Sequence, residues 1–387
     1  MGGLAFATVT SGNGQPPHIP RMPPELYKAI SAECQAKLKK LFNHVVIPRD
    51  APAKVDHGDV DFLVEGILPH TLRSDIWTAT KNIIGAELHL PRGDSHSYAI
   101  PHPEIPDAYV QVDVELSPGN DTPEGAELFE WTRFMKGDSD LLQVIGVSHR
   151  PLGLTCNDRG LHVRVEEIEP YNKKKALVFL TRDPNKAMEF YGFDVSKYWA
   201  GFTDEKDLFD WASSGRFFSH DIFESRVEKS NDRSRQTKRP MYRRFVEQYM
   251  ATHPDQGNNN AWTRQQVLHE ALTYFNKHSE YDAMMEEHRS KEAEEQLWKD
   301  IRAILPVEGN SLALTLKGLR RWVVFQNGEP QITSEPNLEE YQWWVKHISE
   351  EDKGKIIAWV KGNWEEVKAL EKARARAAKE GAKTKSQ

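Results

Sequence analysis

The sequence predicts an α+β protein, in which a mixed sheet with flanking helices precedes a mostly α-helical C-terminal domain. Three observations lead to this prediction. Residues 109–116 alternate strictly between apolar and polar side chains, as a strand with one buried face does. Apolar side chains in residues 24–42 recur at steps of three and four, which indicates a helix. Beyond residue 263 the pattern is almost wholly helical.

The remaining elements follow from the same two periods. A further strand is expected at 60–64, residues 161–165 alternate in the same way, and 45–47 and 176–180 are short apolar runs. Further helices are expected at 71–84, 124–134, 141–146, 183–191, 205–217, 263–277, 280–304, 338–348 and 352–370. Thr263 and Gln266 have the spacing of a capping box, and Asn327-Gly328 is a turn signal.

Composition excludes several classes of protein. The 387 residues are 39% apolar and include 11 Trp, which is enough for a packed core. No apolar run approaches the roughly 18 residues of a membrane span. Cys34 and Cys156 alone supply neither a disulfide framework nor a zinc cage. Since the N-terminus also lacks a signal-peptide pattern, we expect an intracellular protein, cytoplasmic or nuclear and not secreted.

Composition along the chain predicts four parts. Residues 1–23, rich in Gly, Pro, Ser and Thr, are expected to be a disordered leader. Residues 24–225 are expected to form the mixed α+β domain and 226–370 a helical domain, with 371–387 as a basic tail.

Two basic segments interrupt an otherwise acidic chain, whose net charge is −7. Residues 226–244 contain eight basic and two acidic side chains, and residues 368–387 contain seven and two. Both segments are candidate contacts for RNA, and the alternative for each is a solvated surface. Tyr242, Phe245 and Tyr249 have helical spacing, which favours a place in the core over base stacking.

The most informative stretch contains two carboxylates at the start of a predicted strand. Asp59 and Asp61 lie two residues apart, so their side chains leave the same face. Asp113 lies on the polar face of the strand at 109–116 and can supply a third carboxylate. Because carboxylates held this close repel one another, a cation between them would stabilise the arrangement. Hard oxygen ligands favour Mg²⁺, or Mn²⁺ in its place, which completes its shell with substrate phosphates.

The stretches "GDVDFLV" and "VQVDVEL" resemble the paired-carboxylate and third-carboxylate strands of the nucleotidyltransferase superfamily, the polymerase-β-like fold. With "RPLGLTCNDRGLHVRV", they also resemble a group of fungal proteins. The resemblance covers residues 25–220. It implies metal-dependent transfer of a nucleotide from an NTP to an acceptor hydroxyl, for which an RNA 3′ end is one candidate. It implies that Asp59, Asp61 and Asp113 bind the metals, and that Asp113 helps to activate the nucleophile.

The sequence departs from this family just before the paired carboxylates. Where the family has Gly-Ser, this chain has Arg49-Asp50-Ala51-Pro52-Ala53-Lys54, in which Pro lacks an N–H and Asp50 repels phosphate. Arg49 and Lys54 are candidate triphosphate contacts by charge, and Gly58 is a third candidate nucleotide contact. The alternative function is a non-catalytic scaffold or RNA-binding protein with a decayed transferase fold.

Two weaker interpretations of the same residues compete with the nucleotidyltransferase resemblance. His57 and Asp59 have the spacing of part of an iron facial triad, which needs a distant histidine such as His102 or His149. Asp113 and Glu115 suggest a metal-dependent nuclease, but no lysine follows at the required position.

Overall fold

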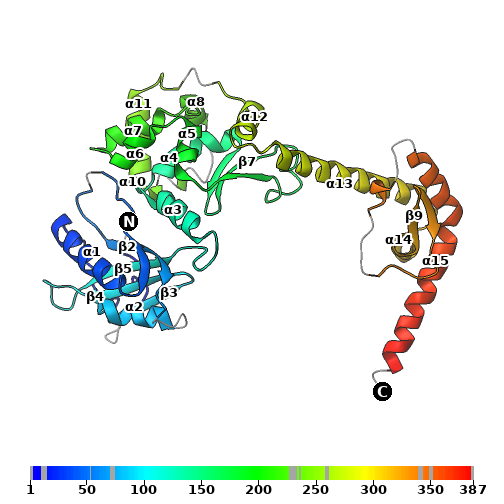
Figure 1. The fold of residues 1–387 in the computed structure, drawn as a ribbon, viewed down its shortest axis with the longest axis horizontal. Coiled ribbons are helices and arrows are strands. Elements are labelled where there is room, and N and C mark those ends of the chain that lie inside the picture. The colour runs from blue at the N-terminus through cyan, green and yellow to red at the C-terminus, as the bar shows by residue number, and fades with distance from the viewer. Residues whose placement is uncertain are drawn as a thin grey trace. The chain divides into compact units, whose positions relative to one another are not determined.

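The protein folds into two compact units of α+β composition, residues 1–278 and 279–387 (Figure 1). The computed structural model describes residues 3–9, 15–52, 54–69, 75–225, 233–234, 237–257, 261–338, 343–347 and 352–384. The boundary between the units lies later than the expected division at 225/226. The reason is that aromatic side chains of the segment beginning at residue 240 pack on earlier helices, as Phe245 does on Phe209 and Phe223.

A five-stranded mixed sheet, with strand order β1-β2-β5-β4-β3, organises the beginning of the first unit. Its strands are β1 (Phe42–Val46), β2 (Asp59–Ile67), β3 (Leu88–Arg92), β4 (Ser95–Pro101) and β5 (Tyr109–Leu116). β2 and β5 are parallel neighbours, and every other pair is antiparallel. The strands predicted at 60–64 and 109–116 are therefore confirmed, and the sequence analysis missed β3 and β4.

Helices α1 (Pro24–Leu38) and α2 (Ile76–Ile84) cover one face of this sheet (Figure 1). The side chains of β2 and β5 that point to these helices are apolar and buried: Val60, Phe62, Val64, Val110, Val112 and Val114. Because side chains alternate along a strand, the polar residues between them must lie on the opposite face. Packing on one face thus decides where the carboxylates point.

The rest of the first unit is built from helices around a three-stranded antiparallel sheet. Its strands are β6 (Leu154–Asn157), β7 (Gly160–Arg164) and β8 (Leu177–Thr181). Its helices are α3 (Gly125–Lys136), α4 (Leu141–His149), α5 (Pro184–Tyr191), α6 (Val195–Ala200), α7 (Glu205–Ser213), α8 (His220–Ser225), α10 (Pro240–Arg244), α11 (Met250–Thr252) and α12 (Arg264–Tyr274). The capping box at the start of α12 is confirmed.

The aromatic side chains in and just beyond the basic segment 226–244 lie in the core, as their spacing indicated. Tyr242 and Phe245 are fully buried, and Tyr249 is almost so. Residues 226–232, 235 and 236 of the expected RNA contact at 226–244 lie outside the described residues.

The beginning of the chain is packed rather than disordered over the residues that the structure describes. Phe6 and Met22 are each 1% exposed. The backbone of Met22 exchanges hydrogen bonds of 2.7 and 2.9 Å with that of His57. The expected leader at 1–23 therefore includes segments that contribute to the core, because the large apolar side chains of Phe6 and Met22 are buried.

The second unit packs three long helices around buried tryptophans. It comprises α13 (His278–Ile304), α14 (Gly309–Trp322), the hairpin of β9 (Val323–Gln326) and β10 (Glu329–Ile332), a 3₁₀ turn (Trp344–Lys346) and α15 (Lys353–Thr384). Trp298 and Trp344 lie 4.9 Å apart between ring centres. The hairpin turns at Asn327 and Gly328, whose φ angles are 50° and 81°. Residues 339–342 and 348 of the helix predicted at 338–348 lie outside the described residues.

Among the helices of the described residues, none combines the length and apolar character needed to cross a lipid bilayer.

The carboxylate of Glu371 in the second unit is buried, at 1% exposed. It accepts hydrogen bonds from Arg321, Trp322 and Arg374. Although burial desolvates this carboxylate, the three donors lower its pKa. We expect Glu371→Ala to lower the unfolding free energy of this unit by about 3 kcal/mol, because it leaves arginines unpaired. Hydrogen–deuterium exchange of α14 and α15 measures the change.

The matched control is Glu380→Ala, which removes a more exposed pair with Arg376. It should change the exchange of these helices little, because exposed ion pairs contribute roughly 0–1 kcal/mol. Equal protection in the Glu371→Ala protein and the wild type would contradict the prediction.

Candidate functional site

The three predicted carboxylates come together on the open face of the five-stranded sheet. Asp61 of β2 lies directly opposite Asp113 of β5, and Asp59 lies opposite Gln111. Neighbouring strands are about 4.8 Å apart, so Asp61 and Asp113 are adjacent across the ladder. Asp59 is on the same face as Asp61, two residues earlier.

Electrostatic repulsion among these groups is evident in their pKa values. Desolvation, followed by the charges of Asp59 and Asp113, raises the pKa of Asp61 to about 7. Desolvation and the charge of Asp59 also raise the pKa of Asp113. The Asp61 side chain is nevertheless reachable by solvent.

Neutral donors fix two of the carboxylates. Gln111 Nε2 donates to both oxygens of Asp113, at 3.0 and 2.9 Å, and Ser97 forms a further side-chain hydrogen bond with it. The backbone N–H of Gly3 donates to Asp59 Oδ2 at 2.9 Å. These contacts orient the carboxylates without neutralising their charge.

One lysine approaches the cluster from α3. Lys136 Nζ lies 2.7 Å from Glu115 Oε2, and Glu115 follows Asp113 on the same face of β5. The charge of Lys136 lowers the pKa of Asp61, but by less than desolvation and the neighbouring aspartates raise it. The sequence analysis missed Lys136, because nothing local links it to a strand 21 residues earlier.

Within the described residues, no group of three or more His, Cys, Asp or Glu side chains could by itself hold a metal ion. Asp59, Asp61 and Asp113 supply the hard oxygen donors that Mg²⁺ or Mn²⁺ binds, but they fill only part of a coordination shell. Water and substrate oxygens would have to complete such a shell, as is usual for Mg²⁺.

Arg49, expected to contact a triphosphate, instead joins two parts of the first unit. Its Nε and Nη2 donate to both oxygens of Asp138, at distances of 2.6–3.1 Å, and Nη1 donates to the Tyr198 carbonyl at 2.6 Å. The guanidinium also lies 4.5 Å from the centre of the Tyr198 ring. Asp138 is 1% exposed. The charge of Arg49 is therefore already balanced by the buried carboxylate of Asp138.

Lys54 and Gly58 lie on the segment that leads into β2. Lys54 is paired with Asp50, the residue expected to repel phosphate. Gly58 is buried, and a side chain added at Gly3 would meet its carbonyl oxygen at 2.5 Å. The structure thus puts the backbone of Gly58 against the N-terminal segment.

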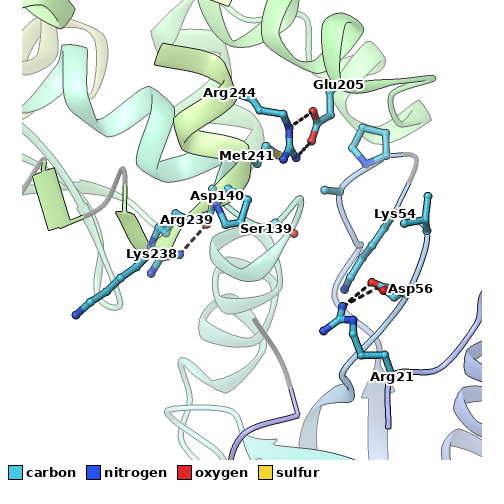
Figure 2. A pocket seen from close by; sticks show the side chains of 14 residues that line it. Arg21, Lys54, Asp56, Ser139, Asp140, Glu205, Lys238, Arg239, Met241 and Arg244 are labelled. Atoms are coloured by element: carbon cyan, nitrogen blue, oxygen red, sulfur yellow. Dashed lines mark hydrogen bonds and ion pairs between the residues drawn. The ribbon is translucent and has the colours of Figure 1, made fainter. Parts of the chain in front are cut away.

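A cavity of about 790 Å³ lies beside this loop, between it and the start of α10 (Figure 2). Its lining includes five basic and three acidic side chains: Arg21, Lys54, Lys238, Arg239, Arg244, Asp56, Asp140 and Glu205.

Ion pairs neutralise all three acidic side chains of the cavity (Figure 2). Arg21 pairs with Asp56 and Arg239 with Asp140, each at 2.7 Å, while Arg244 pairs with Glu205. Lys238 has no ion pair with any residue that the structure describes. The lining therefore has a net positive charge, which is suited to an anion.

The iron-triad interpretation finds no support in this arrangement. The ring of His57 stacks on Tyr27 at 3.6 Å, and His102 Nδ1 accepts backbone hydrogen bonds from Glu104 and Ile105. His149 is 3% exposed, among aromatic rings of the helical part. These histidines do not form a metal-holding group with Asp59 among the described residues.

No protein-family model matches this chain, and no curated protein is significantly similar to it in sequence. The case for a function therefore rests on the geometry and chemistry of the site.

The raised pKa of Asp61 has a consequence for stability. The folded-state pKa of about 7 lies above the ordinary value of about 3.9, so ionisation destabilises the fold as pH rises between these values. We expect Asp61→Asn to raise the unfolding free energy by only about 1 kcal/mol above pH 7, because solvent screens part of the repulsion. Near pH 4 the substitution should leave the unfolding free energy unchanged.

Thermal unfolding from pH 4 to pH 8 without divalent cations measures this difference. Asp158→Asn, at an exposed turn, is the control and should follow the wild type at every pH. An Asp61→Asn protein less stable than the wild type at pH 8 would show that repulsion does not dominate.

The buried pair of Arg49 and Asp138 gives a second test. Arg49→Ala should lower the unfolding free energy by about 3 kcal/mol, because Asp138 loses its partner inside the protein. Urea denaturation measures the loss. Arg133→Ala, which removes an exposed pair with Glu130, should cost less than about 1 kcal/mol. The prediction would be wrong if the Arg49→Ala protein were as stable as the wild type but bound NTP more weakly. Arg49 would then be a phosphate contact.

Proposed function

We propose that this protein is a nucleotidyltransferase, dependent on Mg²⁺ or Mn²⁺, that moves a nucleotide from an NTP to an acceptor hydroxyl. The observation that carries the proposal is the position of Asp61 opposite Asp113, on parallel strands, with Asp59 on the same face. The raised pKa of Asp61 supports it, because a cation would relieve the repulsion that causes it.

The carboxylates would divide the chemistry between them. Asp59 and Asp61 would hold the metal ions, and Asp113 would help to activate the acceptor hydroxyl. The bound ions supply charge that lowers the pKa of the hydroxyl and stabilises the leaving pyrophosphate. The hydroxyl oxygen would form a bond to the α-phosphorus while the bond from that phosphorus to the pyrophosphate oxygen breaks. The hydroxyl proton would pass to solvent.

The basic cavity offers a place for the phosphates of a substrate. Its wall at residues 51, 52 and 54–56 belongs to the segment that precedes β2, which begins at Asp59. Among the described residues Lys238 has no acidic partner, whereas Lys54, Arg21, Arg239 and Arg244 already balance acidic neighbours. We infer that Lys238, rather than the paired Arg49 or Lys54, supplies positive charge to a bound polyphosphate or RNA backbone.

RNA is the acceptor that the basic segments favour. Lys238, Arg239 and Arg244 of the segment 226–244 line the cavity, so this segment lies beside the loop that leads into β2. The helix α15 continues through the expected basic tail as far as Thr384. Contacts of this kind bind the phosphate backbone with little dependence on base sequence.

The alternative of a non-catalytic scaffold or RNA-binding protein has one observation in its favour. The loop that replaces Gly-Ser contains Pro52, and its Arg49 is bound to Asp138. A phosphate could therefore not rest on this loop as it does on a glycine-rich one.

A measurement of nucleotide incorporation separates the two functions. With labelled NTPs, Mg²⁺ and a pool of RNA acceptors, Asp61→Ala should reduce incorporation by 100-fold or more (order of magnitude), because one metal loses a ligand. Asp158→Ala provides a matched loss of an exposed aspartate and should retain full activity.

Thermal unfolding with Mg²⁺ and each NTP complements this assay, because a ligand that binds only the native state stabilises it. Stabilisation by the pair together supports the transferase. Absence of both incorporation and stabilisation, combined with RNA binding that weakens as salt rises, would establish the alternative.

A further inference from the structure

The N-terminal segment, residues 3–9, crosses the open face of the five-stranded sheet beside the carboxylates. Three of its residues contact three successive strands. Gly3 N–H donates to Asp59 of β2, and Ala5 N–H donates to Gln111 Oε1 of β5 at 3.0 Å. Phe6 packs against Ala99 of β4.

The three residues that receive these contacts form one row across the sheet. Asp59 is the ladder partner of Gln111, and Gln111 is the ladder partner of Ala99. The next row consists of Asp61, Asp113 and Ser97. The segment thus follows the first row, and Asp61 in the second row remains exposed.

Gln111 connects the two rows. It is 2% exposed, and its amide has one arrangement that satisfies both neighbours. Its oxygen accepts from Ala5 N–H, while its nitrogen donates to both oxygens of Asp113. Because an ionised carboxylate only accepts hydrogen bonds, the amide cannot be reversed without losing both contacts. Ala5 therefore sets the orientation of Gln111, and Gln111 sets the plane of the Asp113 carboxylate.

The segment is anchored well enough to have this effect. Phe6 is 1% exposed in an apolar cluster of the open face, with Leu88, Leu90 and Tyr109. The carbonyl of Ala5 accepts a hydrogen bond of 3.2 Å from Arg92 of β3. At Gly3, φ is +83° and a side chain would meet the Gly58 backbone, so the fit also requires a glycine.

We propose that the N-terminal segment is a built part of the metal site, and that Gln111 is a positioning residue for Asp113. The segment orients Asp59 directly and Asp113 through Gln111. Both carboxylates therefore keep the orientation that a metal ion needs, despite their mutual repulsion. The inference rests on the proposed function, because it assigns these contacts to the preparation of a divalent-cation site.

Binding of Mn²⁺ to the full-length protein, followed by the electron paramagnetic resonance signal of the free ion, tests the proposal without requiring any transferase activity. Gln111→Leu removes the hydrogen bonds with Ala5 and with Asp113 at similar volume, and Phe6→Ala releases the segment without changing any carboxylate. Each should raise the Mn²⁺ dissociation constant by about 10-fold, as the loss of partners behind metal ligands does.

Gln35→Leu is the matched control. Gln35 is a partly buried glutamine that donates to the carbonyl of Val45, away from the open face. The Gln35→Leu protein should bind Mn²⁺ with the same affinity as the wild type. Thermal unfolding without metal verifies that each variant is folded, and if Gln111→Leu does not fold, Phe6→Ala still decides.

The outcomes separate this proposal from the function on which it rests. Mn²⁺ affinity that is unchanged in both Gln111→Leu and Phe6→Ala would overturn the positioning role alone. Tighter binding by Phe6→Ala would show that the segment competes with the metal, which also overturns it. A wild-type protein that binds no Mn²⁺ would contradict the metal-dependent function, and this inference with it.

Discussion

The parallel pairing of β2 with β5 is the constraint on which the rest of the first unit depends. A parallel neighbour cannot be reached by a tight turn, so the chain between these strands must cross over. Here the crossover contains α2, which covers one face of the sheet, and β3 and β4, which widen the sheet. The register of this one pair then puts Asp61 opposite Asp113. A slip by one residue would turn one of the two carboxylates into the apolar core.

Holding carboxylates so close works against folding, and the surrounding residues limit that effect. Gln111 and Ser97 bind Asp113, Gly3 binds Asp59, and Lys136 supplies a positive charge nearby. The pKa of Asp61 remains raised despite these contacts. A site that is strained without its ligand is common where a protein binds cations or performs chemistry, since the same repulsion strengthens cation binding.

The loop between β1 and β2 shows how a basic residue can have a different role from the one its sequence context favours. Arg49 precedes the paired carboxylates at a position suited to a phosphate contact, yet its guanidinium spans Asp138 and the Tyr198 carbonyl. This interaction ties the sheet to the helical part of the unit. The positive charge near the loop comes instead from the cavity lining, including Lys238, about 180 residues further along the chain.

Sequence alone determined what depends on local periodicity. The strict alternation of 109–116 fixed the face of Asp113, the two-residue spacing fixed the common face of Asp59 and Asp61, and Thr263 with Gln266 fixed the start of α12. Tertiary structure decided everything that requires distant segments to meet. Examples are the adjacency of β2 and β5, the use of Arg49 by Asp138, the packing of Phe6, and the unit boundary after residue 278. The physical reason is that periodicity reports which face of an element is buried, whereas the partner that buries it is selected by packing across the whole chain.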